Sequence, residues 1–482
     1  HPMNLKRCLS FLVVCVFTFF LALVPTSFYG INPETGLPIF TLTQQRVIAI
    51  FVFTAMMWIL EVIPTWTTSV VAIVAILLTT SNKGLGFLMM KDNIGEMTNY
   101  KSIMAAFADP VIMLFLGGFV LAIAASKVGL DVAIAKTLLK PFKKPKWVLL
   151  AFLLIIGVFS MFMSNTATAA MFLTFLAPVL GALPKDEKGK AGLALAIPIA
   201  ANLGGMGTPI GTPPNAIALG ALQNAGIEIN FLSWMLRMVP YVLVMLFLAW
   251  VLLLVMFPFK TEKIELKIEG TSQAPKDHKI IVGITFVVTI LLWMLEGWLG
   301  ISANIVALIP FAVFTATGVF SKEDLKEIDW SVLWMVAGGF ALGTALNRTG
   351  LAAALINSVP FASWNIVVVM ITGGLICWIL SNFISNSAAA NLIVPILAVV
   401  GTALLDDPTA SQSFVALGGL KSLIVGVAMC ASLAMCLPIS TPPNALAHST
   451  GIINTRQMAI VGLIVGVVGI VLGYLMLIFV GF

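Results

Sequence analysis

The chain has 482 residues, of which 60% are hydrophobic and only 10% are charged. This composition, with its long apolar runs, excludes a soluble globular core and indicates an all-α polytopic membrane protein. The net charge of +6 comes from basic residues clustered between apolar segments, so it indicates membrane topology rather than a nucleic-acid partner.

The apolar segments follow one another with short polar connections. The first, from Phe11 to Val24, follows two basic residues as a signal peptide would, but it lacks a small-residue cleavage site, so we expect a retained span. Two further segments, 147–183 and 365–405, are predicted to be re-entrant hairpins. We expect transmembrane segments at 9–24, 47–63, 65–80, 110–126, 191–224, 234–257, 279–297, 302–318, 331–347, 411–450 and 457–480.

Basic residues gather on one side of these spans. They fall mainly in the connections 127–146, 185–190 and 260–279, all on the N-terminal side of the predicted topology. Because short cytoplasmic loops are rich in Lys and Arg, we predict a cytoplasmic N-terminus and an external C-terminus, in the inner (cytoplasmic) membrane.

Two halves of the chain repeat each other. "GGFVLAIAASKVGL" (117–130) recurs as "GGFALGTALNRTGL" (338–351), and "SMFMSNTATAAMFL" (160–173) as "SNFISNSAAANLIV" (381–394). An odd number of predicted crossings separates the copies, which predicts opposite orientations and is typical of a secondary transporter. The predicted organisation is a first span with its outer loop (1–45), repeat 1 (46–257), a cytoplasmic linker (258–278) and repeat 2 (279–482).

Each hairpin has a polar tip inside an apolar run. The first arm of the first hairpin, Val148 to Met163, offers roughly 24 Å of helix, shorter than the ~30 Å hydrocarbon core. A turn within the membrane leaves backbone groups unpaired unless protein, water or a ligand satisfies them. The two predicted tips are Ser164-Asn165-Thr166 and Ser385-Asn386-Ser387.

Paired prolines interrupt the apolar segments that follow the hairpins. Prolines remove hydrogen-bond donors, so the helices 191–224 and 411–450 are predicted to be broken. Broken helices present carbonyl groups to cations and N–H groups to anions. The predicted breaks are Pro213-Pro214-Asn215 and Pro442-Pro443-Asn444.

These motifs resemble the divalent anion/sodium symporter family, also called INDY-type sodium–dicarboxylate transporters. The resemblance covers essentially the whole chain. The C-terminal signature "ASLAMCLPISTPPNALA" departs from the family pattern at Met435 and Ala447, and Ser387 stands where the family has Thr. The resemblance implies eleven spans and two hairpins, a homodimer, separate scaffold and transport domains, and elevator-type movement.

The resemblance also implies site residues. Those for the first sodium ion are Ser160, Ser164, Asn165 and Gly211; those for the second are Ser381, Ile384, Asn386 and Ser440. Neutral oxygens suit a monovalent cation. The substrate dicarboxylate is expected at Ser164, Asn165, Thr166, Thr212, Ser385, Asn386, Ser387 and Thr441.

The implied function is sodium-coupled import of C4 dicarboxylates such as succinate, malate and fumarate. The tips and breaks contain no Lys or Arg, so bound Na⁺ is expected to balance the substrate's charge, which gives a physical reason for coupling. No residue is assigned a catalytic role, because neither tip serine has a His or an acid nearby in the sequence.

Alternatives remain open. They include a sodium-independent dicarboxylate exchanger and a citrate or sulfate symporter of the same family. A proton-coupled carrier would need a buried titratable group, for which Glu61, Glu296 and His448 are candidates, although structural roles are favoured for all three. A channel would need a continuous polar lining, whereas the polar groups are confined to two tips and two breaks.

Overall fold

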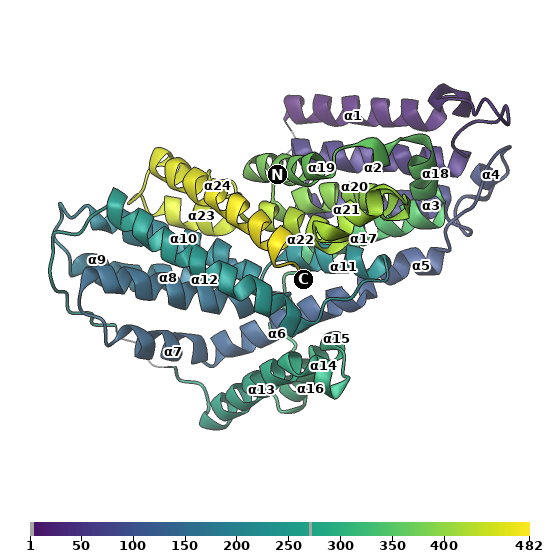
Figure 1. Ribbon diagram of the computed structural model, residues 1–482. Coiled ribbons are helices and arrows are strands. Elements are labelled where there is room, and N and C mark those ends of the chain that lie inside the picture. Colours follow the sequence, from purple (N-terminus) through teal and green to yellow (C-terminus); the bar gives the residue numbers. More distant parts are fainter. Residues whose placement is uncertain (1–3, 269–271) are drawn as a thin grey trace.

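The computed structural model describes residues 4–268 and 272–482, and within these it consists of helices without a β-strand (Figure 1). Ten helices are long and apolar enough to span a membrane, or eleven if one bent pair is counted as a span. This confirms the predicted all-α polytopic class. The predicted segments 1–45 and 258–278 each include residues outside the described ranges.

Outside its helical hairpin and its broken helix, the first half of the chain contains four candidate spans and the shorter apolar helix Thr65–Thr80. Its elements are α1 (Leu5–Leu23), η1 (Thr26–Tyr29), α2 (Leu42–Leu60), α3 (Thr65–Thr80), α4 (Gly86–Met89), α5 (Tyr100–Met104), η2 (Ala105–Ala108), α6 (Pro110–Lys127), α7 (Leu130–Leu139), α8 (Pro145–Phe162), α9 (Asn165–Gly181), α10 (Gly189–Gly204), η3 (Gly205–Gly207), α11 (Pro213–Asn224) and α12 (Phe231–Met256).

The second half follows a similar order. Its elements are α13 (Lys276–Met294), α14 (Glu296–Leu299), α15 (Ala303–Val306), α16 (Leu308–Ala316), η4 (Asp324–Glu327), α17 (Trp330–Arg348), α18 (Leu351–Ser358), η5 (Phe361–Ser363), α19 (Ile366–Phe383), α20 (Asn386–Asp406), α21 (Ala410–Ala416), α22 (Gly419–Ser432), α23 (Pro442–Ser449) and α24 (Thr455–Phe479).

Three features differ from the sequence expectations. The expected span 302–318 is the short pair α15 and α16, separated at Ala307 because Pro310 has no N–H to donate to Val306. The expected helix 411–450 bends by 55° between α21 and α22 before it breaks. The short helices α7 and α18 were not predicted. Each begins after a glycine of the repeated motif, Gly129 (φ 72°) or Gly350 (φ 78°), in the left-handed region that glycine tolerates.

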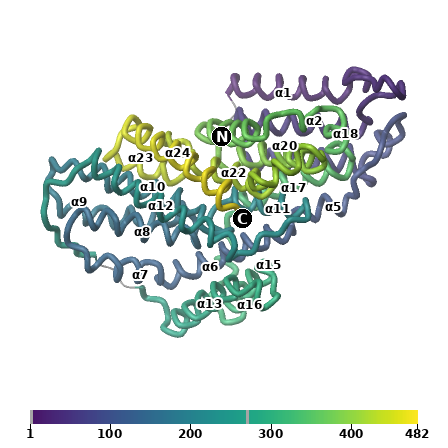
Figure 2. Tube along the Cα trace, viewed as in Figure 1, coloured from purple at the N-terminus to yellow at the C-terminus, as the bar shows by residue number. Residues whose placement is uncertain are grey.

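The two halves interlock around their hairpins. α11 packs against α20 and α22 of the second half, while α23 packs against α9 and α10 of the first half. Figures 1 and 2 show α8, α9, α10 and α12 toward one end of the molecule, with α2, α17, α18 and α20 toward the other. The end of each broken helix therefore lies against the opposite hairpin, and this arrangement brings both tips to one place.

The start of α2 ties several helix ends together. Gln44 donates to the carbonyl of Thr349 after α17 (2.9 Å), and Gln45 donates to carbonyls at the end of α1 (2.7 and 2.9 Å). Arg46 donates to Thr79 near the end of α3 (2.9 Å). The last carbonyls of a helix have no partner within it, so these buried donors satisfy groups that would otherwise be costly to bury.

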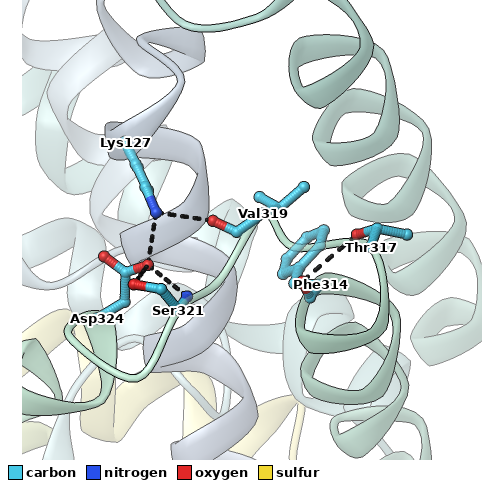
Figure 3. Close-up of polar contacts among 6 residues, drawn as sticks. All are labelled: Lys127, Phe314, Thr317, Val319, Ser321 and Asp324. Atoms are coloured by element: carbon cyan, nitrogen blue, oxygen red, sulfur yellow. Dashed lines mark hydrogen bonds and ion pairs between the residues drawn. The ribbon is translucent and has the colours of Figure 1, made fainter.

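A polar cluster joins α6 to the loop after α16 (Figure 3). Lys127 Nζ lies 2.6 Å from Asp324 Oδ2 and donates to the Val319 carbonyl at 2.9 Å. Asp324 also accepts from the backbone N–H of Ser321 (2.7 Å) and from its hydroxyl (3.0 Å). These contacts place the loop that begins at 127 and the loop at 319–324 on the same side of the molecule.

The interior is apolar, and so is much of the exterior. One cluster of buried hydrophobic side chains extends through both halves and includes Trp58, Trp234 and Trp293. Large apolar side chains also cover the outer faces of α1, α12, α13, α19 and α24. In the most apolar 18-residue stretch of α1, only 6% of the residues are buried. Such faces suit a lipid environment, where outward apolar side chains carry no penalty.

Candidate functional site

The first hairpin turns at a serine cap. α8 ends at Phe162, Met163 is extended, and the hydroxyl of Ser164 accepts from the backbone N–H of Ala167 (3.3 Å) at the start of α9. Asn165 and Thr166 are the first two residues of α9. Because Ser164 provides the cap, the side chains of these two residues are not needed to cap α9.

The second hairpin turns in the same way. The hydroxyl of Ser385 accepts from the N–H of Ala388 (3.1 Å) at the start of α20. Asn386 and Ser387 are the first two residues of α20. The serine that caps this arm is therefore Ser385, not Ser387.

The first helix break lies just before the paired prolines. α10 gives way to η3, an irregular segment follows, and α11 begins at Pro213 with Thr212 before it. Prolines are well tolerated in a first turn, where an N–H has no helical partner. Asn215 bridges the irregular segment, since its amide donates to the carbonyls of Gly205 (3.0 Å) and Thr208 (2.8 Å).

The second break is built alike. α22 ends at Ser432 and α23 begins at Pro442 and Pro443 after Thr441. The Asn444 amide donates to the carbonyls of Met435 (2.9 Å) and Leu437 (3.0 Å). Both asparagines thus hold a break in shape from behind it.

Oxygen atoms converge between the first tip and the first break. The Ser160 hydroxyl donates to the carbonyl of Ala201 (2.6 Å) and contacts the Asn165 side chain. The end of the Asn165 amide lies 3.1 Å from the Gly211 carbonyl and 3.2 Å from that of Ala201. An amide nitrogen turned this way donates to both carbonyls, whereas an amide oxygen turned this way completes a group of acceptors suited to a cation.

The second tip has an equivalent pair but a different neighbour. Ser381 Oγ lies 2.6 Å from Asn386 Oδ1 and 2.9 Å from the Ala431 carbonyl oxygen. A hydroxyl has one proton, so one of these two acceptors is left available. The Ser440 hydroxyl donates instead to the carbonyl of Asn382 (2.7 Å), and Ile384 is buried beside the tip.

Both tips and both breaks line one cavity of about 440 Å³. Six sequence-predicted residues lie behind the lining rather than in it: Ser160, Ser381, Ile384, Pro214, Asn215 and Asn444. The predicted residues that line it are Ser164, Asn165, Thr166, Gly211, Thr212, Pro213, Ser385, Asn386, Ser387, Ser440, Thr441, Pro442 and Pro443. The structure thus brings together segments from both halves of the sequence.

Sequence reasoning did not place four polar residues at this site. Glu61 and Asp329 line the cavity, and Asn202 lines it while donating to Asn444 (3.0 Å) across the two halves. Asn382 bonds Ser440 behind the second tip. Asn202 and Asn382 are amides within apolar runs, which is the signal that identified the tips and could have identified these residues.

The described lining contains no Lys, Arg or His side chain, and its ionisable groups are Glu61 and Asp329. The described residues also contain no cluster of three or more His, Cys, Asp or Glu able to hold a metal. The oxygen atoms that meet behind the two tips belong to neutral hydroxyl, amide and backbone carbonyl groups.

Glu296 and His448, two candidates for proton coupling, do not line the cavity. The Glu296 carboxylate accepts from the N–H groups of Phe231 (3.0 Å) and Ala303 (3.2 Å), which begin α12 and α15. His448 Nε2 lies 3.1 Å from the Thr455 hydroxyl. Both have the structural roles that the sequence favoured, as a helix cap and a local polar contact.

A second cavity, of about 450 Å³, lies along α20 beyond the hairpin tip. Asn391 lines it and donates to the carbonyl of Met335 in α17 (3.0 Å), and Met335 lines the first cavity. Ser387 and Asn391 are one helical turn apart, so one turn of α20 and its contact with α17 separate the two cavities.

Comparison with known proteins agrees with this architecture. The citrate transporter family matches residues 55–418. A sodium-dependent dicarboxylate transporter, SdcS, of Staphylococcus saprophyticus is 30% identical over 469 residues, covering 88% of this chain and 84% of the relative. An uncharacterized transporter of Haemophilus influenzae is 31% identical over 448 residues, covering 88% and 89%.

Solved structures share the fold at low sequence identity. The YdaH transporter of Alcanivorax borkumensis aligns with a TM-score of 0.56 at 13% identity, covering 99% of this chain and 98% of that one. MtrF of Neisseria gonorrhoeae aligns with a TM-score of 0.52 at 14% identity, covering 86% and 94%. With the family match over most of the sequence, the chain belongs to the divalent anion/sodium symporter family of membrane transporters and is not an enzyme.

Proposed function

We propose that this protein imports C4 dicarboxylates together with Na⁺. The observation that carries the proposal is the meeting of four helix N-termini, those of α9, α11, α20 and α23, at one cavity. Its described lining offers hydroxyl and amide groups and no basic side chain. Helix N-termini favour anions through their free N–H groups and dipoles.

The charge balance supports coupling to a cation. A dicarboxylate carries two negative charges, and the described cavity lining adds the carboxyl groups of Glu61 and Asp329. Partial helix charges of about half a unit each cannot offset this alone. Na⁺ held by neutral oxygens near Asn165 and Asn386 would supply the missing positive charge, so substrate affinity should depend on sodium.

The proposed ion sites follow the two oxygen clusters. We assign Ser160, Asn165 and Gly211, with Ser164, to one Na⁺. Ser381, Asn386 and Ser440, with the backbone of Ile384, are assigned to the other. The substrate carboxylates would then lie against the hydroxyls of Thr166 and Ser387, the tip amides, and the helix starts at Thr212 and Thr441.

Uptake of labelled succinate into proteoliposomes tests the proposal. Uptake should rise steeply with external sodium and stay at background in choline. Equal uptake in both buffers would favour a sodium-independent exchanger. Stronger competition by citrate or sulfate than by malate or fumarate would assign another substrate within the family.

We further propose an elevator-type homodimer in the cytoplasmic membrane, with two inverted repeats, a cytoplasmic N-terminus and an external C-terminus. The Lys127–Asp324 contact supports the topology, because it joins two loops that the predicted order of spans places on the cytoplasmic side (Figure 3). Labelling of Lys263→Cys and Glu34→Cys from each side tests the orientation, and light scattering tests the dimer.

A further inference from the structure

A basic cavity lies apart from the substrate cavity, where α8 begins and α12 ends. It has a volume of about 530 Å³, and its lining includes Lys144 and Lys146 at the start of α8 and Lys263 in the segment after α12. With Glu262 as the acidic residue of the described lining, these three lysines leave a net charge of +2. None of the three makes an ion pair with a described residue, so their charges are available to an anion.

The segment after α12 is fixed in place beside the start of α8. The buried Glu187 carboxylate accepts from the backbone N–H (3.1 Å) and the hydroxyl (2.7 Å) of Thr261. The backbone N–H of Ile264 donates to the carbonyl of Lys143 (2.7 Å). These two contacts flank Lys263, so this residue is held at the cavity by the fold and does not extend from a free loop.

The cavity lies at the end of an apolar outer face. Val251 and Val255, one turn apart on α12, are 41% and 73% exposed. Beside them, Trp250 stacks on Trp147 of α8 (5.3 Å between ring centroids) and donates from Nε1 to the carbonyl of Lys146 (2.8 Å). Tryptophans of this kind mark the boundary between hydrocarbon and water, so the lysines lie at the level of lipid headgroups.

We propose that this cavity binds the phosphate group of an anionic phospholipid, whose acyl chains lie along the outer face of α12. Ammonium groups are suitable partners for phosphate, and basic residues close to a membrane surface attract anionic lipids. A free phosphate ion has the same charged group but gains nothing from the adjacent apolar face, which favours the lipid. The site is separate from the substrate cavity and does not depend on what the protein transports.

Binding of phosphatidylglycerol and phosphatidylcholine with identical acyl chains to the purified full-length chain, measured by native mass spectrometry, tests the proposal. The wild type should prefer phosphatidylglycerol. Lys263→Gln should weaken binding of phosphatidylglycerol about fivefold, and the triple variant Lys144→Gln/Lys146→Gln/Lys263→Gln should remove the preference. Glu262→Gln should strengthen the binding, because it removes the negative charge of the lining.

A matched control is Lys185→Gln/Lys188→Gln/Lys322→Gln. It removes the same charge from exposed lysines on the same predicted side of the membrane that do not line the cavity. This control should change the binding of phosphatidylglycerol by less than about twofold. Equal losses in the two triple variants, or a wild type without a preference, would overturn the proposal. Displacement of phosphatidylglycerol by an equal concentration of inorganic phosphate would assign the cavity to a free anion and overturn the lipid.

A phosphatidylglycerol with a photoactivatable headgroup locates the site without a variant. In the wild type it should crosslink to the peptides around 143–148 and 258–264, and an excess of unlabelled phosphatidylglycerol should compete with it. Crosslinks confined to other peptides would contradict the proposal even if the lysine variants failed to fold.

Discussion

The two hairpin tips have the same kinds of residue but are held by different partners. At the first tip, the Asn165 amide reaches the carbonyl of Gly211, and the break closes by backbone contact. A Cβ on Gly211 would lie 2.1 Å from the carbonyl oxygen of Gly205, so only glycine fits there. The group of oxygen atoms at the first tip thus depends on close backbone packing.

At the second tip, a serine takes the place of this close backbone contact, and its hydroxyl makes the contact that Thr208 makes with the Met161 carbonyl at the first tip. Ser440 stands at the position equivalent to Gly211, donates to the Asn382 carbonyl (2.7 Å), and accepts from the N–H of Leu437 (3.0 Å). Asn382 also accepts from the N–H of Cys436 (3.1 Å). The second tip has the same kinds of oxygen group as the first but supports them differently. We therefore expect the first group to be the more rigid and the second the more tolerant of substitution.

The largest effect on uptake should come from replacing the asparagine that is present in both tips. Asn165→Ala and Asn386→Ala each remove a donor and an acceptor that face both the proposed ion and the substrate. Loss of a hydrogen bond to a charged group costs about 1.5–3 kcal/mol, or roughly ten- to a hundredfold in affinity. Sodium-driven succinate uptake should therefore fall to background in both variants, with the folded protein retained.

The contributions of the two tips can be compared by measuring the sodium dependence of uptake in the less damaging variants Asn165→Ser and Asn386→Ser. If the first cluster is the more rigid, Asn165→Ser should raise the sodium concentration for half-maximal uptake more than Asn386→Ser does. Near-normal uptake by either alanine variant would remove that asparagine from the site, and equal sodium shifts would contradict the contrast between the tips.

The next effect concerns the equivalent positions at the two breaks. Gly211→Ala puts a methyl group against the Gly205 backbone, which cannot give way as a flexible side chain could, so uptake should be lost. Ser440→Ala removes two hydrogen bonds, at about 1 kcal/mol each, and should leave measurable uptake with weaker sodium dependence. Ser440→Gly is the matched variant, because it makes the second break resemble the first. Greater damage from Ser440→Ala than from Gly211→Ala, measured as initial uptake rate, would reverse the comparison.

The sequence predicted those parts of the site whose residues are unusual in an apolar helix. Polar tips in apolar runs and paired prolines are visible without a structure, and both halves carried them. The partners of these groups were not visible. Asn382 and Asn202 act through contacts with residues 58 and 242 positions away, respectively, and such pairings depend on how helices pack rather than on spacing. The break in α15–α16 was missed because apolar length outweighed a single proline in the prediction.

A smaller effect should distinguish two equivalent positions far from the tips. Lys127 in α6 and Arg348 in α17 occupy the same place in the repeated motif. Among the described residues, Lys127 pairs with Asp324, whereas Arg348 is exposed and has no ion pair. Lys127→Met should lower the free energy of unfolding by about 1–2 kcal/mol, toward the lower value because the Lys127 side chain is 41% exposed. Arg348→Met should change it by less than about 0.5 kcal/mol.

The same contact predicts a dependence on pH. Burial raises the pKa of Asp324, but hydrogen bonds from Lys127 and Ser321 and the charge of Lys127 outweigh it, so its pKa is lowered below the ordinary value. A lowered pKa in the folded state stabilises the protein above the unfolded pKa, near 3.9 for aspartate, and this stabilisation is lost as pH falls through the folded value. Thermal unfolding in detergent between pH 3 and pH 7 should therefore show a smaller loss at low pH in Asp324→Asn than in wild type. Parallel curves would contradict this role of Asp324.

The smallest effect concerns the one hydroxyl at which the tips differ, Thr166 in the first and Ser387 in the second. Both residues line the cavity, and Ser385 already provides the cap of α20. Ser387→Thr should therefore add a methyl group to the substrate space without removing a helix cap. A bulky tricarboxylate should lose more affinity than a slim C4 dicarboxylate, by about 1 kcal/mol, or roughly fivefold.

Competition of labelled succinate uptake by citrate measures this difference directly. The ratio of the citrate and succinate inhibition constants should rise in Ser387→Thr, while Thr166→Ser, the matched change at the other tip, should lower it. If Ser387 only supports the start of α20, the two substitutions should change stability slightly and leave the ratio alone. Opposite shifts of the ratio would show that both hydroxyls face one shared substrate space. In that space, Ser387 leaves room where a threonine would place a methyl group.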